Sequence, residues 1–198
     1  MLRHATRVAA YAGLTGSTAW VFDVPGGRFT LALSPDPFRG FSGEGTLLML
    51  LSDSEAESHG RMLLDQLGWA STVDAEDLAR LTGLPGSQVA SGLAWLSASG
   101  RLGFDLSDGA WFHRELPIES EKVLRRNPRL KSAQDLVEAG AVTATGQVRW
   151  TVRGVHDTYE LTAAVRRGLV CSCPWELEHA GTRGPCKHVL AVVITVRG

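Results

Sequence analysis

All three cysteines of this 198-residue chain lie within its last thirty residues, and their spacing constrains the fold more than any other feature. Cys171 and Cys173 form a Cys-x-Cys pair, Cys186 and His188 form a Cys-x-His pair, and twelve residues separate the two pairs. Three thiolates and one imidazole fill a tetrahedral Zn²⁺ coordination sphere with no open position, which is typical of a structural site. The sequence therefore predicts one structural zinc ion held by these four residues.

The sequence is compatible with two alternatives to this set of metal ligands. A disulfide between Cys171 and Cys173 would be strained and would leave Cys186 unpaired. His179, between the two pairs, could replace His188 as the fourth ligand, although a Cys-x-His pair at a helix start directs both side chains to one point. Thiolate ligands also need a reducing compartment, so we expect the protein in the cytoplasm.

The last third of the chain resembles the SWIM zinc finger family. The residues that carry the resemblance are the two ligand pairs, Pro174-Trp175 after the first pair, and Gly184-Pro185 before the second, ahead of an apolar helix. The resemblance begins at about Val148. It implies a ββα-like unit with Cys171 and Cys173 at a strand end and Cys186 and His188 at a helix start. It also implies a module that binds DNA or proteins and is not a catalyst.

The remaining sequence indicates an α+β chain in four segments. Residues 1–45 should hold a β-hairpin, with strands 19–24 and 28–33, and a packing loop; residues 46–117 should form a winged-helix-like domain. Residues 118–140 should be a basic helical connector. Residues 141–198 should be the zinc module, in which a two-residue period predicts a three-stranded antiparallel sheet with a helix packed on it.

The segment 46–117 has the element order of a winged helix: helices over 55–67, 75–81 and 88–99, followed by a hairpin over 101–115. Its pattern from Leu78-Ala79 to Leu102 resembles the helix-turn-helix of bacterial winged domains, and the whole arrangement resembles bacterial SWIM zinc finger proteins. That likeness makes 88–99 the recognition helix. The helix has no Arg or Lys, and the wing carries Asp105 and Asp108, so we expect a structural or protein-contact role.

Charge is distributed unevenly along the chain. Residues 1–120 carry 8 basic and 14 acidic side chains, residues 121–146 carry 5 and 3, and residues 147–198 carry 7 and 4. The basic cluster of the connector, from Lys122 to Lys131, is either a solvated helical face or a phosphate-contacting linker. Basic groups thus gather toward the zinc end, and the candidate nucleic-acid contacts are Arg149, Arg153, Arg166, Arg167, Arg183 and Lys187.

These features predict a non-catalytic zinc-binding protein whose basic zinc end binds DNA or a protein partner, with DNA preferred on the family resemblance. The alternative is a protein-interaction adaptor with a purely structural zinc site and no nucleic-acid binding. We expect no enzyme, because His113 and His156 have carboxylate neighbours but no nucleophile at a recognisable spacing. We also expect no small-molecule substrate and no transmembrane helix.

Overall fold

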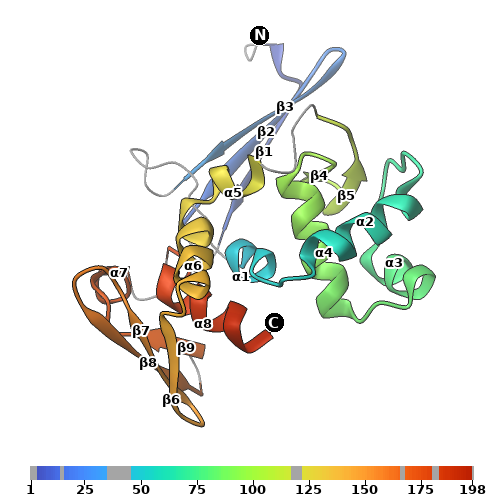
Figure 1. Ribbon diagram of the computed structural model, residues 1–198. Helices are drawn as coiled ribbons and strands as arrows, with labels where there is room; N and C mark the ends of the chain where they lie inside the picture. The colour runs from blue at the N-terminus through green and yellow to red at the C-terminus, as the bar shows by residue number, and fades with distance from the viewer. Residues whose placement is uncertain are drawn as a thin grey trace.

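The computed structural model describes residues 4–13, 16–34, 46–116, 122–165, 168–179 and 183–197 (Figure 1). The fold is α+β, as the sequence predicts. A three-stranded antiparallel sheet comes first, helices with a two-stranded hairpin follow, and a four-stranded antiparallel sheet with a long final helix carries the cysteines. No helix within these ranges is long and apolar enough to cross a membrane.

The N-terminal sheet consists of β1 (Arg7–Ala12), β2 (Thr18–Val24) and β3 (Gly27–Leu33), in that spatial order. The predicted hairpin is β2–β3, and Gly26 in its turn has a φ of 86°. The strand β1 is an addition that the sequence did not indicate. Val21 is buried on one face of the sheet, whereas Trp20 and Leu31 are paired on the other face and exposed. The predicted packing loop over 35–45 lies outside the described residues.

The helical part follows the predicted order. Its elements are α1 (Leu47–Leu51), α2 (Ala56–Leu67), α3 (Ala75–Thr82), α4 (Gly86–Ala98), β4 (Leu102–Asp105) and β5 (Ala110–His113). The Asp74 carboxylate caps α3 by accepting hydrogen bonds from the backbone N–H groups of Glu76 and Asp77. Gly83, with a φ of 71°, ends this helix. The helix α4 begins at Gly86, two residues before the predicted start at residue 88.

Helix α4 is packed on both sides. Leu93 and Leu96 contact α2 and β4, whereas Ala94 packs with α1. At the crossing with α2, a Cβ on Gly92 would lie 2.7 Å from Leu63 Cδ1, so only glycine permits this close approach. No residue from 88 to 99 is exposed. The helix that the winged-helix resemblance assigns to a DNA groove is therefore covered by its own chain.

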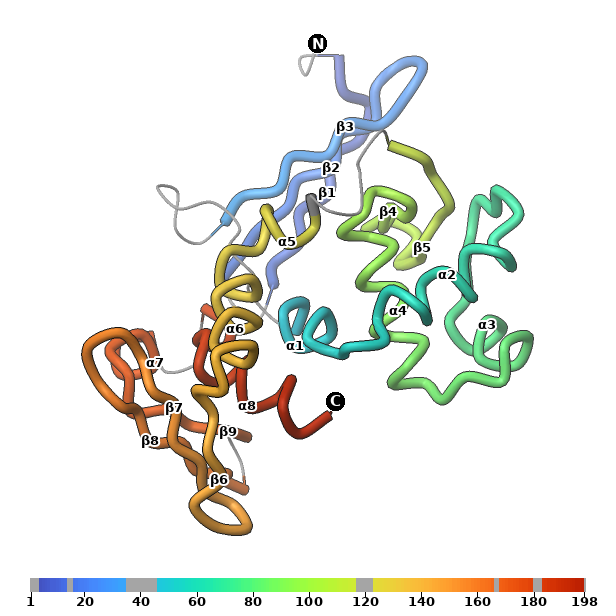
Figure 2. Tube along the Cα trace, viewed as in Figure 1, coloured from blue at the N-terminus to red at the C-terminus, as the bar shows by residue number. Residues whose placement is uncertain are grey.

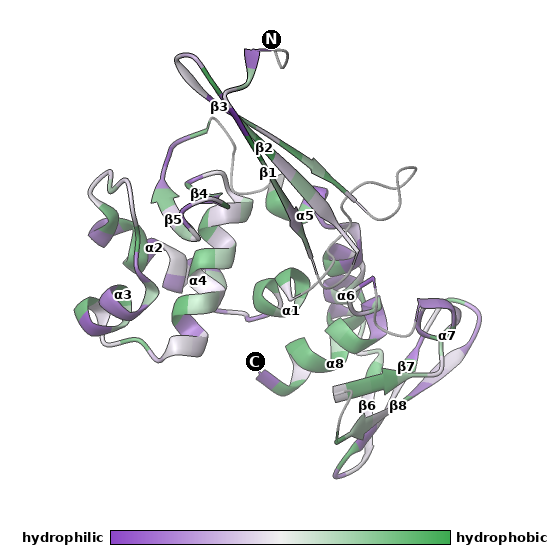
Figure 3. Cartoon of the chain, turned by 180° about the vertical axis from the view of Figure 1, so that it is seen from behind, coloured by the Kyte–Doolittle hydropathy of each residue, from purple (hydrophilic) through white to green (hydrophobic). Residues whose placement is uncertain are grey.

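The C-terminal part begins with α5 (Lys122–Arg126) and α6 (Pro128–Glu138). The sheet follows with β6 (Val142–Gly146), β7 (Arg149–Arg153), β8 (Thr158–Ala164) and β9 (Gly168–Cys171), then α7 (Pro174–His179) and α8 (Lys187–Arg197). The strands pair in chain order, so the sheet has four strands instead of the three predicted, with β6 as the addition. Val152 and Leu161 point inward and pack against α8, which Figure 3 shows as hydrophobic along most of its length.

Helix α8 joins the zinc end to the helices. Leu190 and Ala191 on one side belong to a core that includes residues of α1, α4, α5 and α6. Val192 and Val193 on the other side pack with the sheet and the cysteines. A helix that is apolar on all sides must be buried on all sides. The trace in Figure 2 accordingly places α6 and α1 beside α8, and α5 and α6 of the predicted connector are an integral part of this packing.

Candidate metal centre

The predicted ligands lie at two places in the fold, the junction of β9 with α7 and the start of α8. Cys171 is the last residue of β9, and Cys173 follows immediately before α7. Cys186 directly precedes α8, and His188 is the second residue of that helix. All four side chains are buried at the junction of the sheet and the two helices. The sequence places each pair locally, and the packing of α8 on the sheet brings the pairs together.

The four ligand atoms form a cluster of the size that one metal ion requires. They all lie within 4.8 Å of one another, with the Nδ1 atom of His188 3.8 Å from Cys171 Sγ and 4.0 Å from Cys186 Sγ. Tetrahedral zinc, with Zn–S bonds of about 2.3 Å and Zn–N bonds of about 2.0 Å, sets nitrogen–sulfur separations of roughly 3.5 Å. The donor set and its dimensions therefore fit one structural zinc ion.

His188 uses one ring nitrogen for the cluster. Its Nδ1 atom faces the thiols, while Nε2 is buried and has no hydrogen-bond partner in the described chain. The ring lies 4.4 Å from the ring of Tyr159 on β8, at an interplanar angle of 31°. This aromatic contact holds the imidazole plane where Nδ1 meets the cysteines.

His179 does not belong to the cluster. Its ring makes an edge contact with Trp175 at 4.3 Å, and its Nε2 atom lies 3.9 Å from a carboxylate oxygen of Glu178. The four clustered ligands are those of the predicted set. The alternative in which His179 replaces His188 is thus resolved in favour of His188.

Without a cation, this site favours protonated thiols. Burial raises the pKa of Cys173. A hydrogen bond with Cys171, and then burial, raise the pKa of Cys186 to about 12. The backbone N–H of Val189 lies 3.4 Å from Cys186 Sγ and donates to it, as N–H groups commonly do to metal-bound thiolates. A divalent cation would supply the positive charge that makes deprotonation favourable.

Arg129 of α6 holds the loop in front of Cys186. Its Nη1 atom donates hydrogen bonds to the carbonyl oxygens of Arg183 and Pro185, both at 2.9 Å. Its guanidinium lies 4.4 Å from the centre of the Trp175 ring, whose Nε1–H donates to the Gly184 carbonyl at 3.3 Å. In the sequence, Arg129 is only one member of the basic cluster from Lys122 to Lys131. Its role could not be predicted, because the residues whose carbonyl groups it binds lie 54 and 56 positions away.

The candidate nucleic-acid contacts occupy different environments. Arg149 and Arg153 are exposed on β7, and Lys187 is half-buried at the start of α8. Arg183 is only 8% exposed, so its side chain is not part of the solvent-facing surface. Arg166 and Arg167 lie outside the described residues.

Neither histidine considered for acid–base chemistry forms a pair with its carboxylate neighbour in the structure. The Nδ1 atom of His113 accepts a hydrogen bond from the backbone N–H of Trp69, and the two rings stack at 4.6 Å. His156 is exposed in the turn between β7 and β8. The sequence did not indicate a third histidine site, at buried His59. Its Nδ1 atom lies within 3.2 Å of Ser91 Oγ and 3.5 Å of a carboxylate oxygen of Asp53.

Comparison with known families agrees with the geometry. The family model described as the SWIM zinc finger matches residues 168–197, a segment that contains all four ligands. No curated protein and no solved structure matches the chain significantly.

Proposed function

Since residues 168–197 form a SWIM zinc finger with one structural zinc site, we propose that the module binds nucleic acid, with DNA as the expected form, through the outward face of its sheet. In this proposal the zinc ion has no catalytic role: it fixes the sheet and α8 so that the outward side chains keep their places. Four protein ligands leave no coordination position for a substrate.

The observation that carries the proposal is the alternation along β7. Val152 is fully buried against α8, whereas Arg149 and Arg153 point the opposite way and are exposed. Neither guanidinium forms an ion pair with any described residue. These two arginines lie on one face of the strand, four residues apart, so their Cα atoms are separated by about 13 Å. They can contact two different phosphates of one strand.

The neighbours of these arginines extend a polar surface. Across the ladder, Arg149 is opposite Thr162 and Arg153 is opposite Thr158 on β8. Hydroxyl groups are common phosphate ligands, and together with arginine they bind the backbone without reading sequence. Glu160, opposite Thr151 between the two arginines, is the acidic residue among the paired positions of this face. Its charge should limit the affinity.

The helical part contributes less to such binding. The covered helix α4 offers no exposed residue from 88 to 99, and the first 120 residues carry a net acidic balance. Phosphate contacts supply most of the affinity in nonspecific nucleic-acid complexes. The sheet at the zinc end is therefore the better candidate surface.

The test is binding of zinc-loaded protein to fluorescent random-sequence DNA, single-stranded and duplex, at several salt concentrations. Removing both guanidiniums in Arg149→Ala/Arg153→Ala should reduce the slope of log K against log salt by about 1.4 for single strands and 1.8 for duplex, because two phosphate contacts are lost. The control is Arg61→Ala/Arg80→Ala, which removes two exposed arginines from α2 and α3. Absence of binding even at low salt would rule out the proposal.

A further inference from the structure

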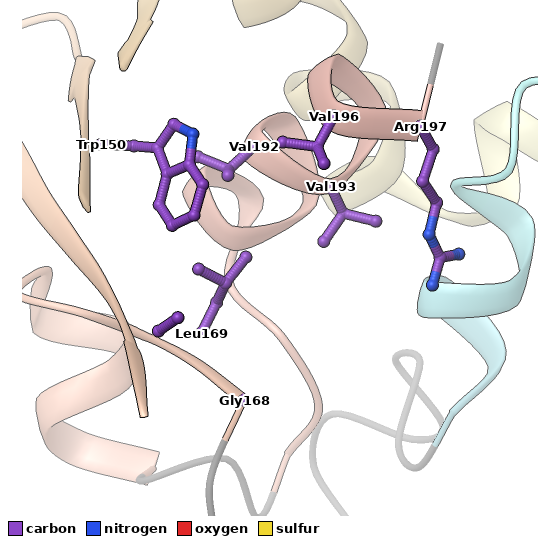
Figure 4. Close-up of a pocket in the computed structure, with 8 residues that line it drawn as sticks. Trp150, Gly168, Leu169, Val192, Val193, Val196 and Arg197 are labelled. Atoms are coloured by element: carbon purple, nitrogen blue, oxygen red, sulfur yellow. The ribbon is translucent and has the colours of Figure 1, made fainter. Parts of the chain in front are cut away.

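A cavity of about 230 Å³ opens beside the second half of α8, at the opposite end of this helix from the metal ligands. Its walls come from four elements: β7, the end of β8, β9 and α8. Figure 4 shows the side chains of Trp150, Leu169, Val192, Val193 and Val196 turned toward one shared space, with Arg197 to one side.

The cavity is lined mainly by apolar side chains, and exposed valines lie at its edge and on the chain segments that adjoin its lining residues. Val196 is 63% exposed at its edge. Val165 follows the last residue of β8 and is fully exposed, and exposed Val148 accepts a backbone hydrogen bond from Ala163, which also lines the cavity. Exposed apolar side chains that gather around one hollow mark interaction surfaces in soluble proteins.

The dimensions favour a side chain of another protein over a free small molecule. At about 30 Å³ per water molecule, the volume equals roughly eight waters, which is room for one or two aliphatic side chains. Small-molecule sites usually enclose about 300–1,000 Å³ and place several polar groups around the ligand. Among the described residues that line this cavity, the one charged residue is Arg197, and the others are apolar side chains or glycine.

Arg197 sets the charge of the partner. Its Nη1 atom is 3.5 Å from the carbonyl oxygen of Met49, and the guanidinium forms no ion pair with a described residue. No acidic side chain is among the described residues of the lining. We propose that this cavity docks an acidic segment of a partner protein, which inserts one or two aliphatic side chains between the sheet and α8 and places a carboxylate against Arg197.

This surface is separate from the proposed nucleic-acid face. Arg149 and Arg153 lie on the outward side of β7, whereas Trp150, between them, lies on the inward side that lines the cavity. The module could thus hold nucleic acid on one side of its sheet and a protein on the other. The inference stands independently of the proposed nucleic-acid binding.

The test uses the zinc-loaded full chain and the blocked tetrapeptide Glu-Leu-Leu-Glu, followed by nuclear magnetic resonance of the Trp150 indole N–H and the amides of 192–197. We expect saturable shifts confined to these groups. The probe Lys-Leu-Leu-Lys should bind more weakly because of Arg197, and Glu-Ser-Ser-Glu should not bind. Val196→Ser should weaken binding of Glu-Leu-Leu-Glu about tenfold, as expected when an apolar anchor contact is lost.

The matched control is Leu177→Ser, which removes an exposed aliphatic side chain from α7, outside the cavity. It should leave peptide affinity unchanged, and Val196→Ser should leave DNA binding unchanged. Absence of shifts at millimolar peptide, or equal binding of the acidic and basic probes, would overturn the proposal. Shifts of the Trp150 signal that depend on protein concentration without peptide would assign the cavity to a second copy of this chain and would also overturn it.

Discussion

Arg129 connects the metal site to helix α6 through two hydrogen bonds and one ring contact. The two carbonyl groups that accept from it belong to the loop just before Cys186, and the ring belongs to Trp175 just after Cys173. A single side chain therefore fixes the approach of both ligand pairs. Groups that orient metal ligands in this way influence affinity nearly as much as the ligands themselves.

We predict that Arg129→Met lowers zinc affinity about tenfold or more, because the loop before Cys186 loses its two charge-assisted hydrogen bonds. Competition with a chromogenic chelator measures this affinity. Arg125→Met removes an exposed arginine from α5 and is the matched control. Equal zinc affinities of the two variants would show that Arg129 does not position the site.

Zinc affinity should also depend steeply on pH. In the folded site without a cation the pKa values of Cys173 and Cys186 are raised, and in an unfolded chain a thiol has a pKa of about 8.5, so in both states these thiols keep their protons at neutral pH and zinc must displace them. Release of at least two protons makes the apparent affinity fall at least about a hundredfold for each unit of decreasing pH. Calorimetric titrations in buffers of different ionisation enthalpy count the released protons. An affinity independent of pH between 6 and 8 would contradict the protonated metal-free state.

At the scale of elements, α8 has the largest structural role. Its first turn supplies a ligand, one side completes the core shared with α1 and α6, and the other side packs on the sheet. Such a helix is stabilised by tertiary contacts on every side more than by its β-branched residues, whose helix propensity is low.

We predict that Leu190→Ala destabilises the protein by about 3–4 kcal/mol, since Leu190 is fully buried and its loss leaves a cavity in the shared core. Val196→Ala, on the exposed last turn of the same helix, should cost less than about 0.5 kcal/mol. Chemical denaturation of the two variants gives the comparison. Similar losses of stability for both variants would mean that α8 does not join the helical core to the sheet.

The features that sequence reasoning found are those encoded by neighbouring residues. The ligand pairs, the predicted helix over 75–81 and the hairpin of β4–β5 each depend on a short run of consecutive residues. The strand β1 was missed because its alanines show no clear alternation of large apolar and polar residues. The strand β6 does alternate, but Val142 is its one large apolar residue, which is too weak a signal to predict a strand. These short strands form because a neighbouring strand supplies their hydrogen bonds.

Long-range contacts explain what the sequence could not show. The clamp by Arg129 and the covering of α4 by α1 both join residues that are far apart in the chain. The helical spacing of Val89, Leu93 and Leu96 predicts one buried side of α4, and in the structure this side packs toward α2. Small residues such as Ala94 on its other side gave no hint of a second packing partner, because alanine is compatible with an exposed or a buried helix face.

At the scale of the whole molecule, the zinc site and the helical core are coupled through α8. Removal of zinc should unfold the sheet and α8, because metal-binding energy in such sites is folding energy. It should also loosen α1 and α6, whose Leu48 and Leu130 pack in the core that α8 completes. The core formed by α2, α3 and β4 has no residue of α8 and should persist.

Hydrogen exchange before and after chelation tests this coupling. We expect the backbone amides of the sheet and α8 to lose protection and those of α1 and α6 to be less protected. The amides of Leu63 and Leu78, in the core that has no residue of α8, should stay protected. The variant Cys186→Ser should reproduce the chelated pattern at any zinc concentration. Loss of protection confined to the ligand loops would show that the zinc end and the helices are energetically independent.

The metal centre is tested most directly by the zinc content of protein purified under reducing conditions, measured by mass spectrometry of the metal. Cys171, Cys173, Cys186 and His188 form one closed set, so we expect about one zinc ion per chain. We also expect His179→Ala to retain this zinc and both Cys186→Ser and His188→Ala to lose most of it. A zinc content near zero in the unmodified protein, or loss of zinc in His179→Ala alone, would contradict the assigned metal centre.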